Sequence, residues 1–188
     1  MVPIQVETQS FLDMAEASHK LAFVDIESTG LRGDYNSVLV VSVKPYGQVP
    51  RSFVVKQPGR DRTVVAAAKV ELEKYECLAT YYGKGFDLPM LNTRLLRHGL
   101  LPIAKRLHID MYYVLKYNLL TARKSQAHLL SWLKTPQQKM TVGAETWNEV
   151  VAREPGALAE MVKRCESDVR GLEALYKKTR HLIADVKR

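Results

Sequence analysis

Two acidic residues separated by a single residue, Asp25 and Glu27, come at the end of an apolar stretch. The stretch predicts a strand over residues 21–26, and residues two apart in a strand point to the same side of the sheet. Like charges that face one space raise each other's pKa and destabilise the site unless a cation lies between them. Carboxylate oxygens are the ligands that Mg²⁺ and Mn²⁺ prefer. The pair therefore indicates a divalent metal site; the alternative is two solvated acids at a strand end.

Two further acids stand in surroundings that are unusual for a carboxylate. Asp87 follows a glycine-containing turn and lies where a helix is expected to begin, so the alternative to a chemical role is a helix cap. Asp168 lies inside a predicted helix. Because aspartate is a modest helix former, an interior position indicates a partner or a role. For Asp168 the alternative is a salt bridge with Arg164, one helical turn earlier.

The apolar pattern predicts a mixed α/β sheet that would position these acids. Five strands are predicted, at residues 21–26, 37–43, 51–56, 77–82 and 107–110. A helical turn is predicted at residues 10–15, and helices at residues 63–75, 88–98, 112–120, 125–133, 145–152 and 157–180. Short loops predict that the first three strands are antiparallel, and helical crossovers predict that the last two run parallel to the first. In such sheets, sites form at the carboxyl ends of the central strands.

The composition is that of a globular protein with excess positive charge. The 188 residues carry a formal net charge of +8, which favours nucleic acid as a partner. No apolar run reaches the roughly 20 residues that a membrane helix needs, and no signal peptide is evident. We expect a cytoplasmic monomer without a membrane partner, in which Cys77 and Cys165 are reduced thiols. The length predicts a single domain over residues 1–188, with its core at about 20–180.

Together the four acids resemble the DEDD set of the ribonuclease H-like 3′–5′ exonucleases, the superfamily of proofreading exonuclease domains. Residues 23–31 resemble the family's first motif, residues 83–92 the second and residues 165–169 the third. The stand-alone branch of bacteria and phages is the most similar. The resemblance implies phosphodiester hydrolysis with two divalent cations, Mg²⁺ or Mn²⁺, about 3.5–4 Å apart. The residues that it implies as catalytic metal ligands are Asp25, Glu27, Asp87 and Asp168.

The resemblance also implies a binding place for the 3′ end of single-stranded nucleic acid, DNA more than RNA. Leu31 would pack on the last base; the alternative is a core residue. The implied substrate-binding residues are Ser28, Thr29, Gly30, Leu31, Lys84 and Phe86. Basic candidates for phosphate contacts are Arg32, Lys84, Arg94 and Arg97. The identity of any polymerase, replication or repair partner stays open.

One position departs from the family's pattern. Members usually carry a tyrosine four residues, or a histidine five residues, before the last aspartate to orient the attacking water. Here these positions hold Arg164 and Lys163, and neither is a good base. Three accounts compete: Tyr82 or His108 orients the water, the metal site suffices at a lower rate, or the site is inactive.

These accounts lead to three functional hypotheses. The first is the exonuclease, the second a nuclease of the same fold that cuts internally, and the third a non-catalytic nucleic-acid-binding or polymerase-associated module. Three further residues have two interpretations each. Asp110 is a metal ligand or a helix cap, Lys139 is a phosphate contact or, more commonly, a solvated lysine, and Trp147 is a core residue rather than a base-stacking platform.

Overall fold

The computed structural model describes residues 4–140, 143 and 145–186. These residues form a five-stranded sheet with the strand order β3-β2-β1-β4-β5. β1 pairs antiparallel with β2, and β2 pairs antiparallel with β3, whereas β4 runs parallel to β1 and β5 parallel to β4. The strands are β1 (Leu21–Ser28), β2 (Val38–Pro45), β3 (Arg51–Val54), β4 (Cys77–Thr80) and β5 (Leu107–Asp110). The predicted mixed α/β sheet, with three antiparallel strands and two parallel ones, is confirmed.

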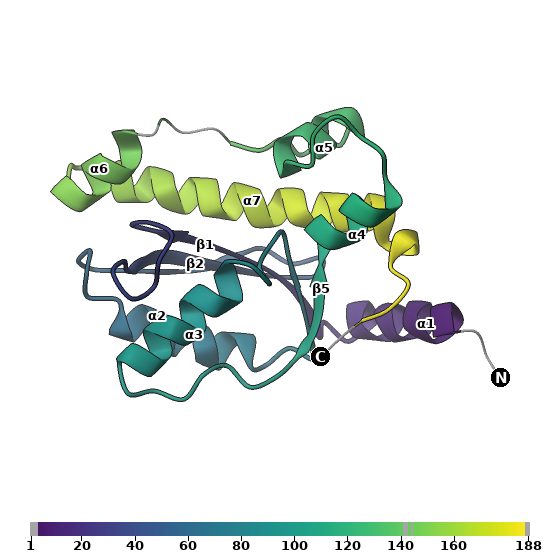
Figure 1. Cartoon of the computed structure of the whole chain (residues 1–188), viewed down its shortest axis with the longest axis horizontal. Coiled ribbons are helices and arrows are strands. Elements are labelled where there is room, and N and C mark those ends of the chain that lie inside the picture. The colour runs from purple at the N-terminus through teal and green to yellow at the C-terminus, as the bar shows by residue number, and fades with distance from the viewer. Residues whose placement is uncertain (1–3, 141–142, 144, 187–188) are drawn as a thin grey trace.

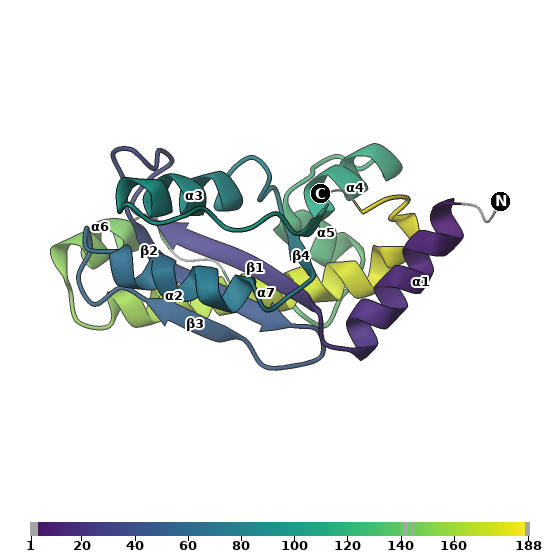
Figure 2. The ribbon, with the colours of Figure 1, turned by 90° about the horizontal axis from the view of Figure 1, so that it is seen from below.

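Helices cover both faces of this sheet. In Figure 1, α7 (Ala157–Thr179) crosses one face, and α2 (Arg62–Leu72) and α3 (Asp87–Arg97) lie against the other. Figure 2 shows the second face, with α2 and α3 in front of the strands. The other helices are α1 (Ile4–Ala17), α4 (Met111–Asn118), α5 (Gln126–Trp132) and α6 (Glu145–Ala152), followed after α7 by a 3₁₀ turn at Arg180–Leu182. Together the helices shield the apolar faces of the sheet from water.

The alternation of side chains along β1 decides which face the acids occupy. Val24 and Ile26 pack in a core cluster with α2 and α3, whereas Phe23 packs in a second cluster with the C-terminal half of α7. Because successive strand residues point to opposite faces, Asp25 and Glu27 lie on the same face as Phe23. β1 runs two residues past its predicted end, because it stays paired with β2 through Ser28. The acids therefore lie inside a paired strand near its carboxyl end.

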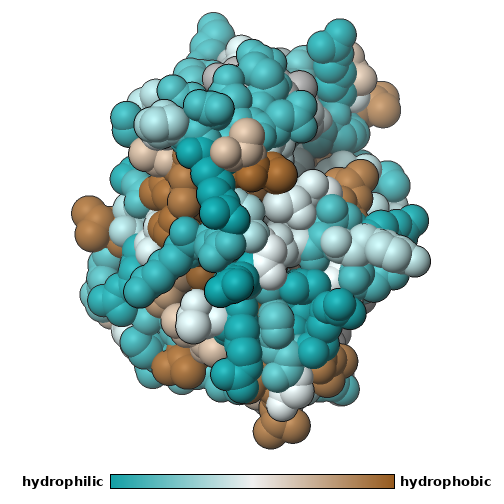
Figure 3. Space-filling view, turned by 90° about the vertical axis from the view of Figure 1, so that its left-hand side faces the viewer, coloured by the Kyte–Doolittle hydropathy of each residue, from teal (hydrophilic) through white to brown (hydrophobic). Residues whose placement is uncertain are grey.

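The N-terminal helix is the element that the sequence pattern described least well. A single turn is predicted at residues 10–15, but α1 has 14 residues. Leu12 and Ala15 are buried in the cluster that also contains Leu21 and Ile183, so tertiary packing stabilises a helix with weak periodicity of its own. On the face shown in Figure 3, hydrophilic side chains predominate and hydrophobic ones occur in small groups. No helix among the described residues is long and apolar enough to cross a membrane.

Candidate active site

Three elements bring the four predicted acids together. Asp25 and Glu27 come from β1 and Asp168 from α7, and carboxylate oxygens of these three residues lie within 4.8 Å of one another. Asp87 is the first residue of α3, and its Oδ1 accepts a hydrogen bond from the backbone N–H of Ile26 at 3.1 Å. All four acids line one cleft of about 540 Å³. Asp87 is thus fixed beside β1, but it lies outside the closest group of three.

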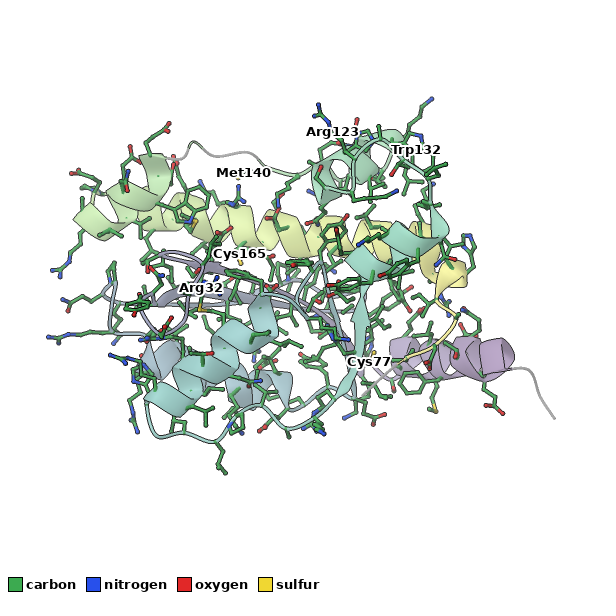
Figure 4. The ribbon with its side chains drawn as sticks, viewed as in Figure 1. Arg32, Cys77, Arg123, Trp132, Met140 and Cys165 are labelled. Carbon is green, nitrogen blue, oxygen red and sulfur yellow. The ribbon has the colours of Figure 1, made fainter. Side chains whose placement is uncertain are left out.

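The rest of the cleft combines apolar, aromatic and basic side chains. Leu31 is 79% exposed, so it is not the core residue that the alternative interpretation suggested. Figure 4 shows Arg32 on the loop after β1, Cys165 on the side of α7 that faces the sheet, and Met140 on the segment that leads to α6. Besides the four acids, the lining residues are Ile26, Leu31, Arg32, Tyr81, Tyr82, Gly85, Phe86, Lys139 and Arg164.

Burial and mutual repulsion disfavour the charged forms of the acids. Burial, and then the charges of Asp87, Asp168 and Glu27, hold the pKa of Asp25 well above its usual range. Burial also raises the pKa of Asp87 to about 7. The pKa values of Glu27 and Asp168 are raised as well, chiefly by burial. Four carboxylates whose charged forms are destabilised in this way form a site that an added cation would stabilise.

One carboxylate oxygen in the cleft is evidence for a site that binds a cation through oxygen ligands. Asp168 is 3% exposed, and its Oδ2 lies 2.7 Å from Lys139 Nζ. Its Oδ1 is buried and has no hydrogen-bond partner among the residues that the structure describes. A buried, unpaired carboxylate oxygen costs free energy, and such an atom in a native site calls for a ligand or a functional reason. The donor set consists of carboxylate oxygens, which suits Mg²⁺ or Mn²⁺.

Arg164 occupies the position where the family's tyrosine is expected. Its Nε lies 2.6 Å from Glu27 Oε1, and its guanidinium lies over the ring of Trp147 at 5.0 Å. Burial alone would lower the pKa of Arg164, but Glu27 together with Asp168 and Asp25 raises that pKa above its usual range. Arg164 therefore stays protonated and cannot accept a proton from water. Its contact with Asp168 is longer, at 4.0 Å, so the salt bridge considered for Asp168 is the weaker of the two.

Lys139 corrects an expectation drawn from the sequence. It was expected to be a solvated lysine, but its side chain is 25% exposed and pairs with Asp168 inside the cleft. The two residues are 29 positions apart, and no spacing rule connects a loop lysine with a helix aspartate. Lys139 and Arg164 together bring two positive charges to the four carboxylates of the cleft.

Arg94 is a second correction, because it is not available for a phosphate contact. It is 5% exposed, and its Nε and Nη2 each lie 2.8 Å from an oxygen of Asp61. Its Nη1 donates to the carbonyl of Gly33 at 3.0 Å, which ties α3 to the loop that carries Leu31 and Arg32. The Asp61–Arg94 pair was missed in the sequence, because Asp61 stands in a charged loop 33 positions away.

The other predicted phosphate contacts are all exposed, but only one lines the cleft. Arg32 belongs to the lining residues, whereas Lys84 and Arg97 do not. Ser28, Thr29 and Gly30 also lie outside the lining set. The Ser28 hydroxyl donates to the carbonyl of Gly30 at 2.7 Å, and Thr29 exchanges hydrogen bonds with Ser37. These residues build the turn that presents Leu31.

The two candidates for orienting a water differ in access to the cleft. Tyr82 lines it and is 46% exposed. His108 does not line it, and its Nε2 is hydrogen-bonded to the Thr80 hydroxyl at 2.8 Å. Asp110 is the N-cap of α4, and it also accepts hydrogen bonds from the backbone N–H groups of Tyr82 and Lys84 at 2.8 and 2.9 Å. Asp110 thus acts as a cap and holds the turn of Tyr82.

Comparison with known proteins assigns the chain to a protein superfamily. Residues 22–180 match the RNase H superfamily, and the chain belongs to it. A solved structure with a similar fold is the family B DNA polymerase from the hyperthermophilic archaeon Pyrobaculum calidifontis, with a TM-score of 0.66 and 19% sequence identity. The match covers 84% of this chain and 24% of that one, so the chain spans about a quarter of the polymerase's length. None of the curated proteins compared with the chain gives a significant match.

Proposed function

We propose that the chain is a metal-dependent nuclease of the DEDD type that removes nucleotides from the 3′ end of single-stranded nucleic acid, DNA more than RNA. The observation that carries this proposal is the close group of half-buried Asp25 with buried Glu27 and Asp168, joined by Asp87 in one cleft. Membership of the RNase H superfamily supports a nuclease. The resemblance to proofreading exonucleases supports the 3′–5′ direction and a single nuclease domain over about residues 20–180.

The carboxylates of Asp25, Glu27, Asp87 and Asp168 would hold two divalent cations, Mg²⁺ or Mn²⁺. When bound, such ions stabilise the negative charge that develops on the scissile phosphate and favour ionisation of the attacking water. The strongest support for cation binding by this donor set is Asp168 Oδ1, a buried atom that has no hydrogen-bond partner among the described residues.

The remaining lining residues would position the substrate. Leu31 and Phe86 offer apolar surface for the terminal base, and Arg32 offers a positive charge for a phosphate. The Tyr82 hydroxyl is the candidate for orienting the attacking water, because the family's tyrosine is replaced by Arg164 and His108 lies outside the lining. Arg164 would keep Glu27 oriented through their 2.6 Å contact.

A second candidate function is a non-catalytic nucleic-acid-binding module. The observation that favours it is the pairing of Arg164 with Glu27 and of Lys139 with Asp168, at 2.6 and 2.7 Å. These two cations already neutralise part of the acidic cluster, which lowers its attraction for a metal ion. This candidate predicts binding that weakens with salt, and no turnover.

The deciding experiment uses 5′-labelled single-stranded DNA and RNA with Mg²⁺, Mn²⁺ or EDTA. A metal-dependent ladder that shortens from the 3′ end is expected for the wild type and should be absent for Asp25→Ala. Asp34→Ala is the matched control, because Asp34 is an exposed aspartate of the nearby loop that does not line the cleft. A circular single strand should stay intact, and its cleavage would indicate internal cutting instead. Intact linear substrate under every condition would overturn the nuclease in favour of the binding module.

A further inference from the structure

A row of tyrosine rings leads from the cleft onto α4. Tyr82, which lines the cleft, lies 6.1 Å from Tyr113 between ring centroids, and Tyr113 lies 6.3 Å from Tyr117 with the two rings almost parallel at 19°. Tyr112 packs edge-on against both Tyr82 and Tyr113, each at 5.1 Å. Tyr82 and Tyr117, at the two ends of the row, are 46% and 76% exposed, and Tyr113 between them is half-buried. The rings therefore form a continuous path from the cleft to the surface. We call Tyr82, Tyr113 and Tyr117 the tyrosine row.

The first ring of the row is held in place by its backbone. Tyr82 has a φ of +67°, in the left-handed region that side chains other than glycine rarely adopt. Its N–H donates to Asp110, the residue that also caps α4, so one carboxylate fixes both the turn and the start of the helix. A Cβ on Gly85 would lie 2.6 Å from the Tyr82 ring, so this position must be a glycine for the ring to lie there. A large aromatic residue kept at a strained position indicates a functional reason.

The segment that begins with α4 is rich in basic residues, and the acid beside the tyrosine row is Asp110, which caps the helix. Residues 111–144 contain five lysines and arginines and no aspartate or glutamate. Lys116 lies over the rings of Tyr112 and Tyr117, at 5.8 and 5.5 Å. Figure 4 shows Arg123 beyond α4, near α5. Aromatic faces interleaved with lysine and arginine are the combination that single-stranded nucleic acid recognises, through base stacking and phosphate contacts.

We propose that the tyrosine row binds the bases of a single strand that lie 5′ to the terminal nucleotide in the cleft. The inference rests on the proposed substrate, but it concerns binding outside the acidic cluster. Stacking on Tyr113 and Tyr117 requires unpaired bases, because the faces of paired bases are already stacked inside a duplex. Lys116 would contact the backbone beside the two rings. The row would thereby restrict the site to single-stranded ends and favour substrates of several nucleotides.

Fluorescence anisotropy of the 188-residue chain in EDTA tests this binding site without cleavage. The probes are 5′-labelled oligothymidylates of three and twelve nucleotides and a blunt duplex. Tyr117→Leu and Tyr113→Leu should each weaken binding of the twelve-nucleotide probe about tenfold, which equals about 1.4 kcal/mol. Tyr117→Phe keeps the ring and should bind within about twofold of the wild type. The trinucleotide and the duplex should bind equally to all variants.

Several results would overturn the proposal. These are wild-type-like binding of the long probe by both leucine variants, equal losses for the short and long probes, or no measurable binding of the long probe by the wild type. Tyr117 is the more informative position, because a residue that is 76% exposed contributes little to folding. Thermal melting of Tyr117→Leu should therefore match the wild type. If cleavage fails but ring-dependent binding remains, only the nuclease proposal falls; if cleavage occurs and the rings make no difference, only the tyrosine row falls.

Discussion

Two aspartates inside this molecule, the half-buried Asp25 and the fully buried Asp61, have opposite electrostatic surroundings. Asp61 has 0% exposure, and its oxygens accept hydrogen bonds from Arg94, His98 and the backbone N–H of Val38. Burial alone would raise its pKa, but these hydrogen bonds outweigh burial and lower it. Asp25 faces three other acids, and its pKa is raised well above the usual range.

The difference separates a carboxylate that stabilises the fold from one that is available for chemistry. Around Asp61 the chain supplies the partners itself: the ion pair ties α3 to the loop before α2, and the hydrogen bond from Val38 ties that loop to the start of β2. Around Asp25 and Asp168 the chain supplies too little positive charge, and the Oδ1 of Asp168 has no hydrogen-bond partner within the described part of the chain. Burial of an acid therefore does not by itself distinguish a structural role from a chemical one. The distinction depends on whether the oxygens of the acid have hydrogen-bond partners.

The largest effect on folding is expected for Asp61→Asn. Breaking a buried ion pair leaves Arg94 uncompensated, which costs about 3–5 kcal/mol in the free energy of unfolding. Urea denaturation followed by circular dichroism measures this loss, with Asp34→Asn as a control at an exposed aspartate. A loss below about 1 kcal/mol, the range of a surface ion pair, would mean that the Asp61–Arg94 pair does not have the structural role assigned to it.

A smaller effect, of opposite sign, is expected when a divalent cation is added. A ligand that binds the folded state alone stabilises it by about 2.7 kcal/mol at a hundredfold excess over its Kd. Mn²⁺ should therefore raise the melting temperature of the wild type and of Asp61→Asn, but not of Asp168→Asn. The measurement is a thermal melt in EDTA and in increasing Mn²⁺. An equal rise in Asp168→Asn would show that the ion binds outside the acidic cluster.

The same comparison explains what could be predicted from the sequence. β1 and the acids of the cleft were predictable, because an apolar strand interrupted by Asp25 and Glu27 is a local pattern. The basic residues that pair with the buried acids could not be predicted. Arg94 and Lys139 find Asp61 and Asp168 across 33 and 29 positions, and only the assembled fold decides whether a basic residue meets a buried acid or a phosphate. This is why Arg94 was wrongly predicted as a phosphate contact. The strand directions were predictable for a different reason, since short loops favour antiparallel neighbours and helical crossovers favour parallel strands.

The pH dependence of stability should reflect the lowered pKa of Asp61. In the unfolded chain an aspartate has a pKa of about 3.9, so above that value Asp61 is charged in both states and its contribution is fully present. As the pH falls towards the lower pKa of the folded state, the unfolded chain binds the proton first, and the contribution is lost. The advantage of the wild type over Asp61→Asn should therefore be smaller at pH 3.5 than at pH 6, measured by urea denaturation in EDTA. An advantage that stayed constant over this range would contradict the lowered pKa.

The smallest change in stability is expected for Asp25→Asn in EDTA, where asparagine keeps the shape and removes the charge. Asp25 faces Asp87, Asp168 and Glu27, so losing its charge relieves repulsion, and the free energy of unfolding should stay constant or rise by about 1 kcal/mol. The same variant should lose the stabilisation by Mn²⁺, because one of the proposed ligands becomes neutral. Paired denaturation curves with and without Mn²⁺, beside those of Asp61→Asn, measure both effects. A destabilisation of several kcal/mol in EDTA would place Asp25 with Asp61 among the structural acids, since repulsion among the four carboxylates would then be offset by contacts that the fold needs.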